Sequence, residues 1–491
     1  MKTLCGIDLG TQSCKVVLYD YEKKAIVAKA QVPVDMIAEN DGSREQKAEW
    51  YDAALKAAFD KLDGALKKTV AAVGVSGHQH SFVPLDAAGK ALYNVKLWCD
   101  TSTQNECDDL TRAAGGEAAL IKLTGLPMRT GYTAPKVLWL KKHKPEAFAK
   151  LAHILLPHDY LNWLLTGEYT AEYGDASGTA LFDVRERKWS DKVCAYIDPK
   201  VIGCLPRLVK PGESAGAVSA AAANLYGIPA GIPVAAGGGD NMMGAIGTGA
   251  VRDGTLTMSL GTSGTLFGFS NEPVIDPTGN LAAFCSSTGG WLPLLCTMNC
   301  TVATEELREL FNLDVKAFDG EAAKSPIGAD GLVVLPFFNG ERTPNLPYGR
   351  ASINGITVAN FKRENIARAS LEAAIFGMRI GLEGFHELGF KAREIRLTGG
   401  GAKSPLWQSI AANVMNLPVR LPAGDEAAAM GGAIQALWCL EGKGAGIEAF
   451  TEAHVGLEGN LINPDPVSAA AYDKAYGEYS RYLGALSPLY K

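Results

Sequence analysis

The sequence predicts an α/β protein made of two large domains that share a duplicated fold. Its 491 residues are too many for one ordinary hydrophobic core, so two domains are expected. Strand-like segments alternate with an amphipathic helix, which is typical of an α/β domain. The segment Leu9-Gly10-Thr11-Gln12-Ser13 is echoed by Leu260-Gly261-Thr262-Ser263-Gly264. We therefore expect one copy of the fold in residues 1–247 and a second in residues 248–491.

The first copy opens with three short strands, predicted over Thr3 to Leu9, Lys15 to Tyr19 and Ala25 to Val32. These segments are rich in Val, Ile, Leu and Tyr, and polar turns separate them. Apolar residues near helical spacing then predict one amphipathic helix from about Gln46 to Lys68. An apolar strand over Val70 to Val75 follows. This order of elements supports the α/β assignment.

The clearest unit of the second copy is a strand, a glycine turn and a helix. Glu394 to Leu397 is predicted as the strand, and three glycines follow it. Ser404 is expected to cap the next helix, with Pro405 at its first position. A glycine turn before a helix N-terminus suits the binding of a ligand. The buried stripe of this helix is expected at Leu406, Ile410, Val414 and Leu417.

Composition and charge exclude several classes of protein. The net charge is −6 and no basic run is interleaved with aromatic residues, so nucleic acid is not an expected partner. We find neither a signal-peptide pattern nor 18 consecutive apolar residues, so we expect a cytoplasmic protein without a membrane partner. The ten cysteines form no CxxC pair, which favours reduced thiols over a metal site. The sequence leaves a homodimer open.

Asp8 is a candidate metal-linked carboxylate. It stands at the end of a predicted buried strand, where an unpartnered carboxylate would be costly. A hydrated Mg²⁺ ion would supply the partner, because this ion is usually held by one or two carboxylates and water. The following Gly-Thr turn offers N–H and hydroxyl donors to phosphate oxygens. The alternative is an ordinary hairpin turn with Asp8 hydrogen-bonded locally.

Asp240 is a candidate general base toward a sugar hydroxyl. It follows the apolar run Pro233 to Ala236 and the glycines Gly237 to Gly239, where a small polar substrate could approach closely. A carboxylate in such a position can accept a proton from a hydroxyl group. The alternative is an Asp that serves only as a turn or helix-cap residue.

Two further segments are candidates for binding a ligand. His78 and His80 lie two apart at a predicted strand end, which would place both rings on one face. No third ligand is evident nearby, so hydrogen bonding to a polyol is favoured over zinc. Gly399-Gly400-Gly401 fits neither a Walker loop nor a dinucleotide fingerprint. Three glycines in a row would instead give a flat backbone for a planar base.

Taken together, these segments resemble the FGGY family of carbohydrate kinases over nearly the whole chain. The resemblance depends on many separate stretches in the same order, including two that are similar to the family's signatures. The stretches are Asp8 to Thr11, Gly131 to Trp139, Leu156 to Leu161, Leu165 to Glu168, Asp175 to Thr179, Gly237 to Asn241, Ser259 to Gly264, Asn339 to Pro344, Ala351 to Glu372 and Gly399 to Gly401.

The resemblance implies an actin-like, ribonuclease-H-like ATPase fold with two duplicated domains around a central cleft. It implies ATP and Mg²⁺ as cofactors and a sugar as the acceptor, with D-xylulose expected. Asp240 corresponds to the family's catalytic base and Asp8 to its metal-linked catalytic carboxylate. The implied sugar-binding residues are Gln79, His80, Asp240 and Asn241. The implied ATP-binding residues are Thr11, Gln12, Gly261, Thr262, Ser263, Gly400 and Gly401.

Departures from the family pattern bear on the sugar. Family members that act on xylulose often carry Gln-Met-His-Gly, where this chain has His78-Gln79-His80-Ser81. The family's Trp-Asn-Asp-x-Arg segment is Trp98-Cys99-Asp100-Thr101-Ser102 here. The Arg-Glu pair usual in glycerol kinases is absent. D-ribulose, L-ribulose, L-xylulose and gluconate therefore stay open as acceptors. Outside this class, the alternatives are an actin-like ATPase without sugar transfer and a pseudokinase.

Overall fold

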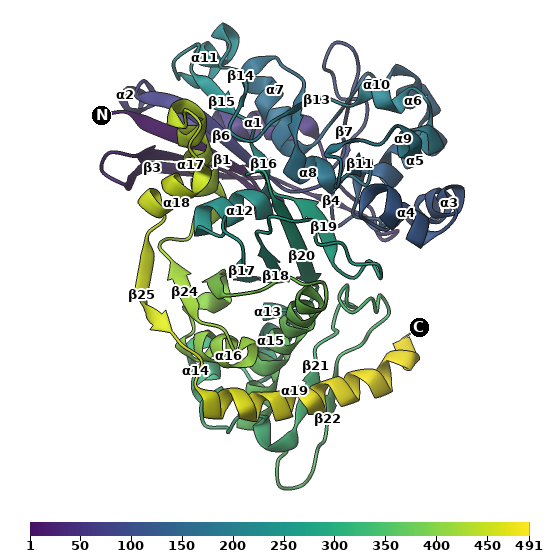
Figure 1. The fold of residues 1–491 in the computed structure, drawn as a ribbon, viewed down its shortest axis with the longest axis vertical. Helices are drawn as coiled ribbons and strands as arrows, with labels where there is room; N and C mark the ends of the chain where they lie inside the picture. The colour runs from purple at the N-terminus through teal and green to yellow at the C-terminus, as the bar shows by residue number, and fades with distance from the viewer. Residues whose placement is uncertain (491) are drawn as a thin grey trace. The chain divides into compact units, whose positions relative to one another are not determined.

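The computed structural model describes residues 1–490, which form two compact units (Figure 1). The first unit contains Met1–Arg252, Phe269–Leu292 and Glu426–Val455. The second unit contains Asp253–Gly268, Pro293–Asp425 and Gly456–Lys491. Each unit thus combines segments that are distant in sequence. The expected domain boundary between residues 247 and 248 remains a prediction.

The first unit is built on a mixed sheet in the strand order β14-β15-β6-β1-β2-β3. Strand β1 pairs antiparallel with β2 and parallel with β6, and β6 also pairs with the short strand β16. This hairpin with a parallel neighbour confirms the predicted opening of the chain. The bounds are β1 Thr3–Leu9, β2 Ser13–Asp20, β3 Ala25–Pro33, β6 Val70–Gly77, β14 Ser214–Ala217, β15 Pro233–Ala235 and β16 Gly238–Gly239.

Helices cover both faces of this sheet, because successive residues of β1 point to opposite sides. Cys5 and Ile7 belong to a core with helices α1, α7 and α11. Leu4 belongs to a second core with α17, which crosses β1 and β6 in Figure 1. The bounds are α1 Ala48–Asp60, α7 Pro157–Thr166, α11 Ala220–Tyr226, α12 Asp240–Thr248, α17 Ala427–Glu441 and α18 Ile447–His454.

A separate helical core lies within the first unit, between β6 and α11 in the sequence. Its apolar residues come mainly from six helices, α3, α4, α5, α6, α9 and α10, among them Leu110, Leu120, Val137 and Val193. The helices of this part are α3 Gln104–Ala114, α4 Glu117–Thr124, α5 Thr133–His143, α6 Pro145–Lys150, α8 Tyr173–Ser177, α9 Asp191–Ile197 and α10 Val201–Cys204. Its short strands are β7 Val83–Leu85, β9 His153–Leu155, β10 Thr170–Glu172, β11 Phe182–Asp183, β12 Lys188–Trp189 and β13 Arg207–Val209. The other short strands of the first unit are β4 Ile37–Ala38, β5 Arg44–Gln46, β8 Val95–Lys96 and β19 Ala282–Cys285.

The second unit repeats the sheet of the first. Its strands follow the order β20-β18-β17-β23-β24-β25. Strand β17 pairs antiparallel with β18 and parallel with β23, as β1 does with β2 and β6. The outer pair β24–β25 is antiparallel, like β14–β15. These matches confirm the predicted duplication. The bounds are β17 Thr255–Leu260, β18 Gly264–Gly268, β20 Trp291–Thr297, β23 Glu394–Thr398, β24 Val419–Pro422 and β25 Leu457–Ile462.

Helices α15 and α19 are the longest of the second unit. Helix α15 contacts α13, α14, α16 and the strand β21, so it lies at the centre of the packing. The remaining bounds are α13 Thr301–Leu310, α14 Val315–Ala322, η1 Ala329–Gly331, β21 Val333–Leu335, β22 Ser352–Asn354, α15 Arg363–Glu387, η2 Gly400–Lys403, α16 Pro405–Met415, α19 Pro466–Leu486 and η3 Ser487–Tyr490.

Two local predictions need correction. The helix predicted from Gln46 to Lys68 is broken, because Asp63 accepts backbone hydrogen bonds from Ala65 and Leu66 and starts a new helix, α2 (Gly64–Lys67). In α16 the cap Ser404 and Pro405 are confirmed, but Trp407 is buried where Leu406 was expected.

The expectations for cysteines and membrane spans can also be compared with the structure. All ten cysteines are free, as expected. Within residues 1–490, no helix combines the length and the apolar character that crossing a bilayer requires.

Candidate active site

Asp8 lies near the end of β1 and accepts a hydrogen bond from Ser76 Oγ on β6, at 2.8 Å. The neighbouring strand places Lys15 opposite it, and Lys15 forms an ion pair with Glu426, the residue directly before α17. Burial raises the pKa of the Asp8 carboxyl, although the Ser76 hydrogen bond and the charge of Lys15 oppose the rise. A carboxylate in this state gains from a nearby cation.

Asp240 is the first residue of α12, directly after the glycine strand β16. Its Oδ1 accepts hydrogen bonds from the backbone N of Asn241 at 2.8 Å and from Asn241 Nδ2 at 3.1 Å. Burial, followed by the negative charges of Asp8 and Asp175, raises the pKa of Asp240 to about 7. The carboxylate therefore titrates near neutral pH, which suits a general base.

Gln79 and Asn241 meet beside Asp240. Asn241 Nδ2 donates to Gln79 Oε1 at 2.6 Å, and Gln79 Nε2 donates to Met242 Sδ at 3.1 Å. A side chain on Gly239 would lie 2.5 Å from Gln79 Cγ, so the glycine permits this approach. The side-chain amide of Asn241 thus connects Gln79 with Asp240.

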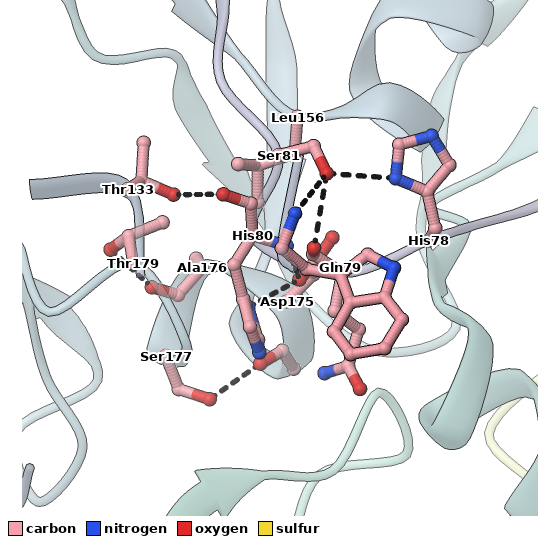
Figure 2. A network of polar contacts seen from close by, with 12 residues as sticks. His78, Gln79, His80, Ser81, Thr133, Leu156, Asp175, Ala176, Ser177 and Thr179 are labelled. Atoms are coloured by element: carbon pink, nitrogen blue, oxygen red, sulfur yellow. Dashed lines mark hydrogen bonds and ion pairs between the residues drawn. The ribbon is translucent and has the colours of Figure 1, made fainter. Parts of the chain in front are cut away.

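His80 also lies in this part of the first unit, but not as the sequence predicted. Strand β6 ends at Gly77, so His78 and His80 do not share a strand face. His78 hydrogen-bonds with Ser81 Oγ at 2.8 Å, whereas His80 contacts Asp175 (Figure 2). Burial lowers the pKa of His78 to about 3, which leaves its imidazole neutral. The shared face expected for the two rings is therefore wrong.

Asp175 and His158 are residues that motif reasoning did not single out. Asp175 Oδ2 lies 3.1 Å from His158 Nδ1, and Asp175 Oδ1 lies 3.1 Å from His80 Nδ1. Burial acts to raise the pKa of Asp175, but hydrogen bonds from His158 and His80 outweigh it and bring the pKa to about 2. The only sequence signal for both residues was their place in family-like stretches, because no local spacing connects them.

Thr11 and Gln12 form the turn between β1 and β2. Thr11 Oγ1 accepts a hydrogen bond from Trp98 Nε1 at 2.9 Å, and its carbonyl accepts one from Gln46 Nε2 at 2.7 Å. The carbonyl of Gln12 accepts from the backbone N of Val34. The turn is therefore held by three donors from other segments.

The other predicted ATP-binding residues lie in the second unit. Gly261, Thr262 and Ser263 form the turn between β17 and β18, and their carbonyls bind the start of α13: Cys300 N donates to Thr262 O and Thr301 N to Gly261 O. Gly400 and Gly401 form a 3₁₀ turn, not the flat backbone expected from three glycines. A side chain on Gly401 would lie 2.4 Å from the Trp407 ring. The predicted ATP-binding residues are thus divided between the units. Thr11 and Gln12 lie in the first, and the other five lie in the second.

The residues around Asp8 fit a Mg²⁺ ion. Among residues 1–490, no group of three or more His, Cys, Asp or Glu side chains is placed to hold a metal. Mg²⁺ does not need such a group, because it commonly keeps several waters and binds through one carboxylate and substrate phosphates. Asp8 supplies a hard oxygen ligand whose pKa is raised by burial. A cation there would offset that burial.

The arrangement in the first unit can perform acid–base chemistry on a polar ligand. It combines a carboxylate that titrates near pH 7 with an amide pair and a carboxylate–imidazole contact. These are groups that hydrogen-bond to hydroxyls and accept their protons.

Comparison with known proteins gives a consistent result. Residues 3–247 match the model of the FGGY family of carbohydrate kinases, N-terminal domain, and residues 256–440 match that of the C-terminal domain. A xylulose kinase of Haemophilus influenzae is 43% identical over 99% of both chains. A xylulose kinase of Streptomyces coelicolor is 36% identical over 90% of this chain and 88% of its own. A solved "xyloylose kinase" from Brucella ovis has a TM-score of 0.91 at 30% identity and covers 99% of this chain and 100% of its own.

Proposed function

Because the chain belongs to the FGGY family of carbohydrate kinases, we propose that it transfers the γ-phosphate of ATP to D-xylulose and forms D-xylulose 5-phosphate. Its two duplicated units have the actin-like ATPase fold of that family. D-xylulose is proposed as the acceptor because the similar proteins in Haemophilus influenzae and Streptomyces coelicolor are xylulose kinases.

The observation that carries this proposal is the arrangement of Asp240 with Asn241 and Gln79. Asp240 Oδ1 already accepts two hydrogen bonds from Asn241, so we assign Oδ2 as the atom that faces the sugar hydroxyl. The pKa of about 7 leaves much of this carboxylate ionised at neutral pH. Gln79 is held next to the base by Asn241, which suits a contact with a neighbouring sugar hydroxyl.

In the reaction, Asp240 Oδ2 takes the proton of the attacking hydroxyl, O5 in the case of xylulose. The hydroxyl oxygen bonds to the γ-phosphorus, the bond from that phosphorus to the β–γ bridging oxygen breaks, and ADP leaves. Such transition states are loose and need positioning and charge neutralisation more than covalent help. A Mg²⁺ ion near Asp8 would neutralise negative charge on the ATP phosphates.

We propose that the remaining predicted residues bind ATP. We propose that the turns at Thr11–Gln12 and Gly261–Ser263 donate hydrogen bonds to phosphate oxygens, since glycine-containing turns present backbone N–H groups to anions. Gly400 and Gly401 are proposed to contact the adenosine. A cytoplasmic location is proposed because all ten cysteines are free thiols, as is usual in a reducing compartment.

An assay of ADP release tests the proposed acceptor. ATP with Mg²⁺ is offered with D-xylulose, L-xylulose, D-ribulose, L-ribulose, gluconate or glycerol. We expect kcat/KM to be highest with D-xylulose by at least about tenfold, or about 1.4 kcal/mol of transition-state discrimination. A higher value with another sugar would reassign the acceptor. ADP release that ignores every sugar would instead favour an ATPase without sugar transfer.

Asp240→Ala is the companion variant for this assay. We expect turnover to fall by about 100-fold or more while ATP still binds, because a general base contributes about that much. Asp276→Asn is the matched control, since Asp276 is a buried carboxylate whose oxygens accept hydrogen bonds only within its own loop. Near-normal turnover of Asp240→Ala would remove Asp240 from the mechanism.

A further inference from the structure

The backbone of His80 is held by three hydrogen bonds. Its carbonyl accepts from Thr133 Oγ1 at 2.9 Å, and its N–H donates to Asp175 Oδ1 at 3.2 Å (Figure 2). The carbonyl also accepts from Lys136 Nζ at 3.0 Å. These contacts keep φ at 59°, a left-handed conformation that side-chain-bearing residues rarely adopt. Such strain persists where surrounding contacts over-determine the conformation.

The imidazole ring of His80 is fixed as firmly as its backbone. It packs against Tyr132 at 5.6 Å and Phe284 at 5.1 Å between ring centroids. On a third side lies Gly178, where a side chain would come within 1.8 Å of His80 Cε1. The ring is therefore confined, and one edge carries Nδ1 toward Asp175 Oδ1 at 3.1 Å.

The ionised Asp175 beside Nδ1 favours a proton on that nitrogen. An unprotonated ring nitrogen and a carboxylate oxygen are both acceptors and would repel each other at 3.1 Å. Asp175 is fully buried, and hydrogen bonds from His158 Nδ1 and from the backbone N–H of His80, together with the charge of His158, keep its pKa low, so it is the ionised partner. In the neutral imidazole of His80, Nδ1 then carries the proton and Nε2 is the acceptor.

Asp175 is itself held in place from two directions. On one side, His158 lies between Asp175 Oδ2 at 3.1 Å and Asp159 Oδ1 at 2.9 Å. Asp159 also accepts a hydrogen bond from the backbone N of Leu156 at the start of α7. Burial disfavours the charged form of His158, but the two carboxylates outweigh it and raise its pKa above its ordinary value.

On the other side, Asp175 belongs to the short helix α8. Glu172 caps this helix by accepting the backbone N–H groups of Gly174 and Asp175, both at 2.6 Å. The carboxylate of Asp175 is thus fixed by a capped helix and by a cationic imidazole. Asp159, His158, Asp175 and His80 form one continuous chain from α7 to the candidate sugar site.

We propose that Asp175, held by His158, is a positioning residue that keeps the proton on Nδ1 of His80 and so makes Nε2 the atom that accepts a hydrogen bond from a sugar hydroxyl. This inference rests on the proposed function, because it assigns His80 to sugar binding. Carboxylate partners fix the tautomer and orientation of functional histidines in this way. Asp175 acts through His80 and does not touch the sugar.

A double-mutant cycle tests whether Asp175 acts through His80. Asp175→Asn is expected to raise KM for the sugar about tenfold, the worth of about one hydrogen bond, with kcat and KM for ATP changed less than threefold. His80→Ala is expected to raise the same KM at least as much, and the double variant no further. Additive effects, or a loss confined to kcat, would overturn the proposal.

Asp276→Asn is again the matched control, because it removes a buried carboxylate of the first unit whose oxygens accept hydrogen bonds from its own loop. We expect it to lower the melting temperature without raising KM for the sugar. A similar rise of KM in this variant would assign the effect of Asp175→Asn to a general loss of stability.

Nitrogen-15 NMR of histidine-labelled enzyme decides the tautomer without any sugar or variant activity. His80 is assigned by comparison with His80→Gln, and its Nδ1 is expected to give the shift of a protonated ring nitrogen. An unprotonated Nδ1 would overturn the proposal. This test uses the wild-type ring, so it holds even if Asp175→Asn fails to fold. If the wild-type enzyme phosphorylates none of the sugars, the proposed function fails while this spectrum still decides the role of Asp175.

Discussion

At the scale of single residues, Asp240 combines two opposing electrostatic effects. As the first residue of α12 it lies at the positive end of a helix, which favours the carboxylate. Burial and the nearby charges of Asp8 and Asp175 favour the neutral acid, and the resulting pKa is about 7. The proposed general base therefore lowers the stability of the protein above neutral pH.

This conflict predicts that Asp240→Asn stabilises the protein in alkaline solution. The pKa in the folded state is about 7 and lies above the unfolded value of about 3.9, so the folded state binds more protons between these pH values. The free energy of unfolding contributed by this group therefore falls as the pH rises from about 4 to about 7. We expect a gain of about 1 kcal/mol at pH 8 that shrinks toward pH 5, measured by thermal unfolding.

The matching control is Asp276→Asn, which removes an acceptor of backbone hydrogen bonds and should destabilise the protein at both pH values. Asp240→Asn that is less stable than the wild type at pH 8 would contradict this account of its pKa.

The same scale shows what sequence could and could not predict about the site. Asp8 and Asp240 could be proposed because each stands near or just after the end of an apolar segment, where a carboxylate needs a reason to be present. Asp175 could not, because its partners His80 and His158 lie 95 and 17 residues away in the sequence. No short-range spacing encodes a contact that only the folded helices α7 and α8 create.

At the scale of elements, the packing of α17 on the first sheet depends on glycine. A side chain on Gly74 would lie 2.0 Å from the carbonyl oxygen of Gly432, and one on Gly6 would lie 2.0 Å from that of Ala429. On the other side of α17, a side chain on Gly431 would lie 1.8 Å from the carbonyl oxygen of Met243 in α12. Backbone thus packs against backbone across both contacts, which accounts for some of the 55 glycines of the chain.

Gly74→Ala is therefore expected to lower the free energy of unfolding by about 2 kcal/mol or more, because the added methyl group overpacks a contact with main chain that cannot rotate away. Urea denaturation measures the change. Gly64→Ala is the control, since no atom lies within 4 Å of the added carbon and the residue is in the short helix α2. It should be neutral or stabilise by less than about 1 kcal/mol. Equal losses in both variants would contradict the close packing.

The sequence could predict the strands of the first hairpin almost to the residue, but not α17 as their partner. Thr3–Leu9 was predicted from its apolar character, and the structure has the same bounds. Helix α17 lies more than 400 residues later, and its glycines give no sign of what they approach. The helix predicted from Gln46 to Lys68 failed for a local reason, because the cap at Asp63 outweighs the helical spacing.

At the scale of the whole molecule, the units do not follow the order of the chain. The first unit needs Phe269–Leu292 and Glu426–Val455 in addition to its first 252 residues. The duplication is visible in the two sheets. Each unit nevertheless includes segments that lie between or after segments of the other unit in the sequence. A simple cut between two halves of the sequence would therefore leave the first unit incomplete.

We expect a fragment of residues 1–252 to lack a cooperative unfolding transition. It would expose the sheet face of Leu4, Tyr19 and Ala72 that α17 covers, and burial of apolar surface drives folding. Denaturation followed by fluorescence, together with binding of a hydrophobic dye, measures this. A fragment with residues 426–455 joined through a flexible linker should recover a cooperative transition, at least in part. A stable fragment 1–252 would show that α17 is dispensable.

The late position of α17 in the sequence also affects how the protein folds during its synthesis on the ribosome. After residue 252 has been made, about 200 residues must follow before α17 and its neighbours are complete. This takes roughly 10–40 s at about 5–20 residues per second. During that interval the apolar face of the first sheet that α17 later covers stays exposed. We expect the growing chain to depend on chaperones that shield such surfaces until translation ends.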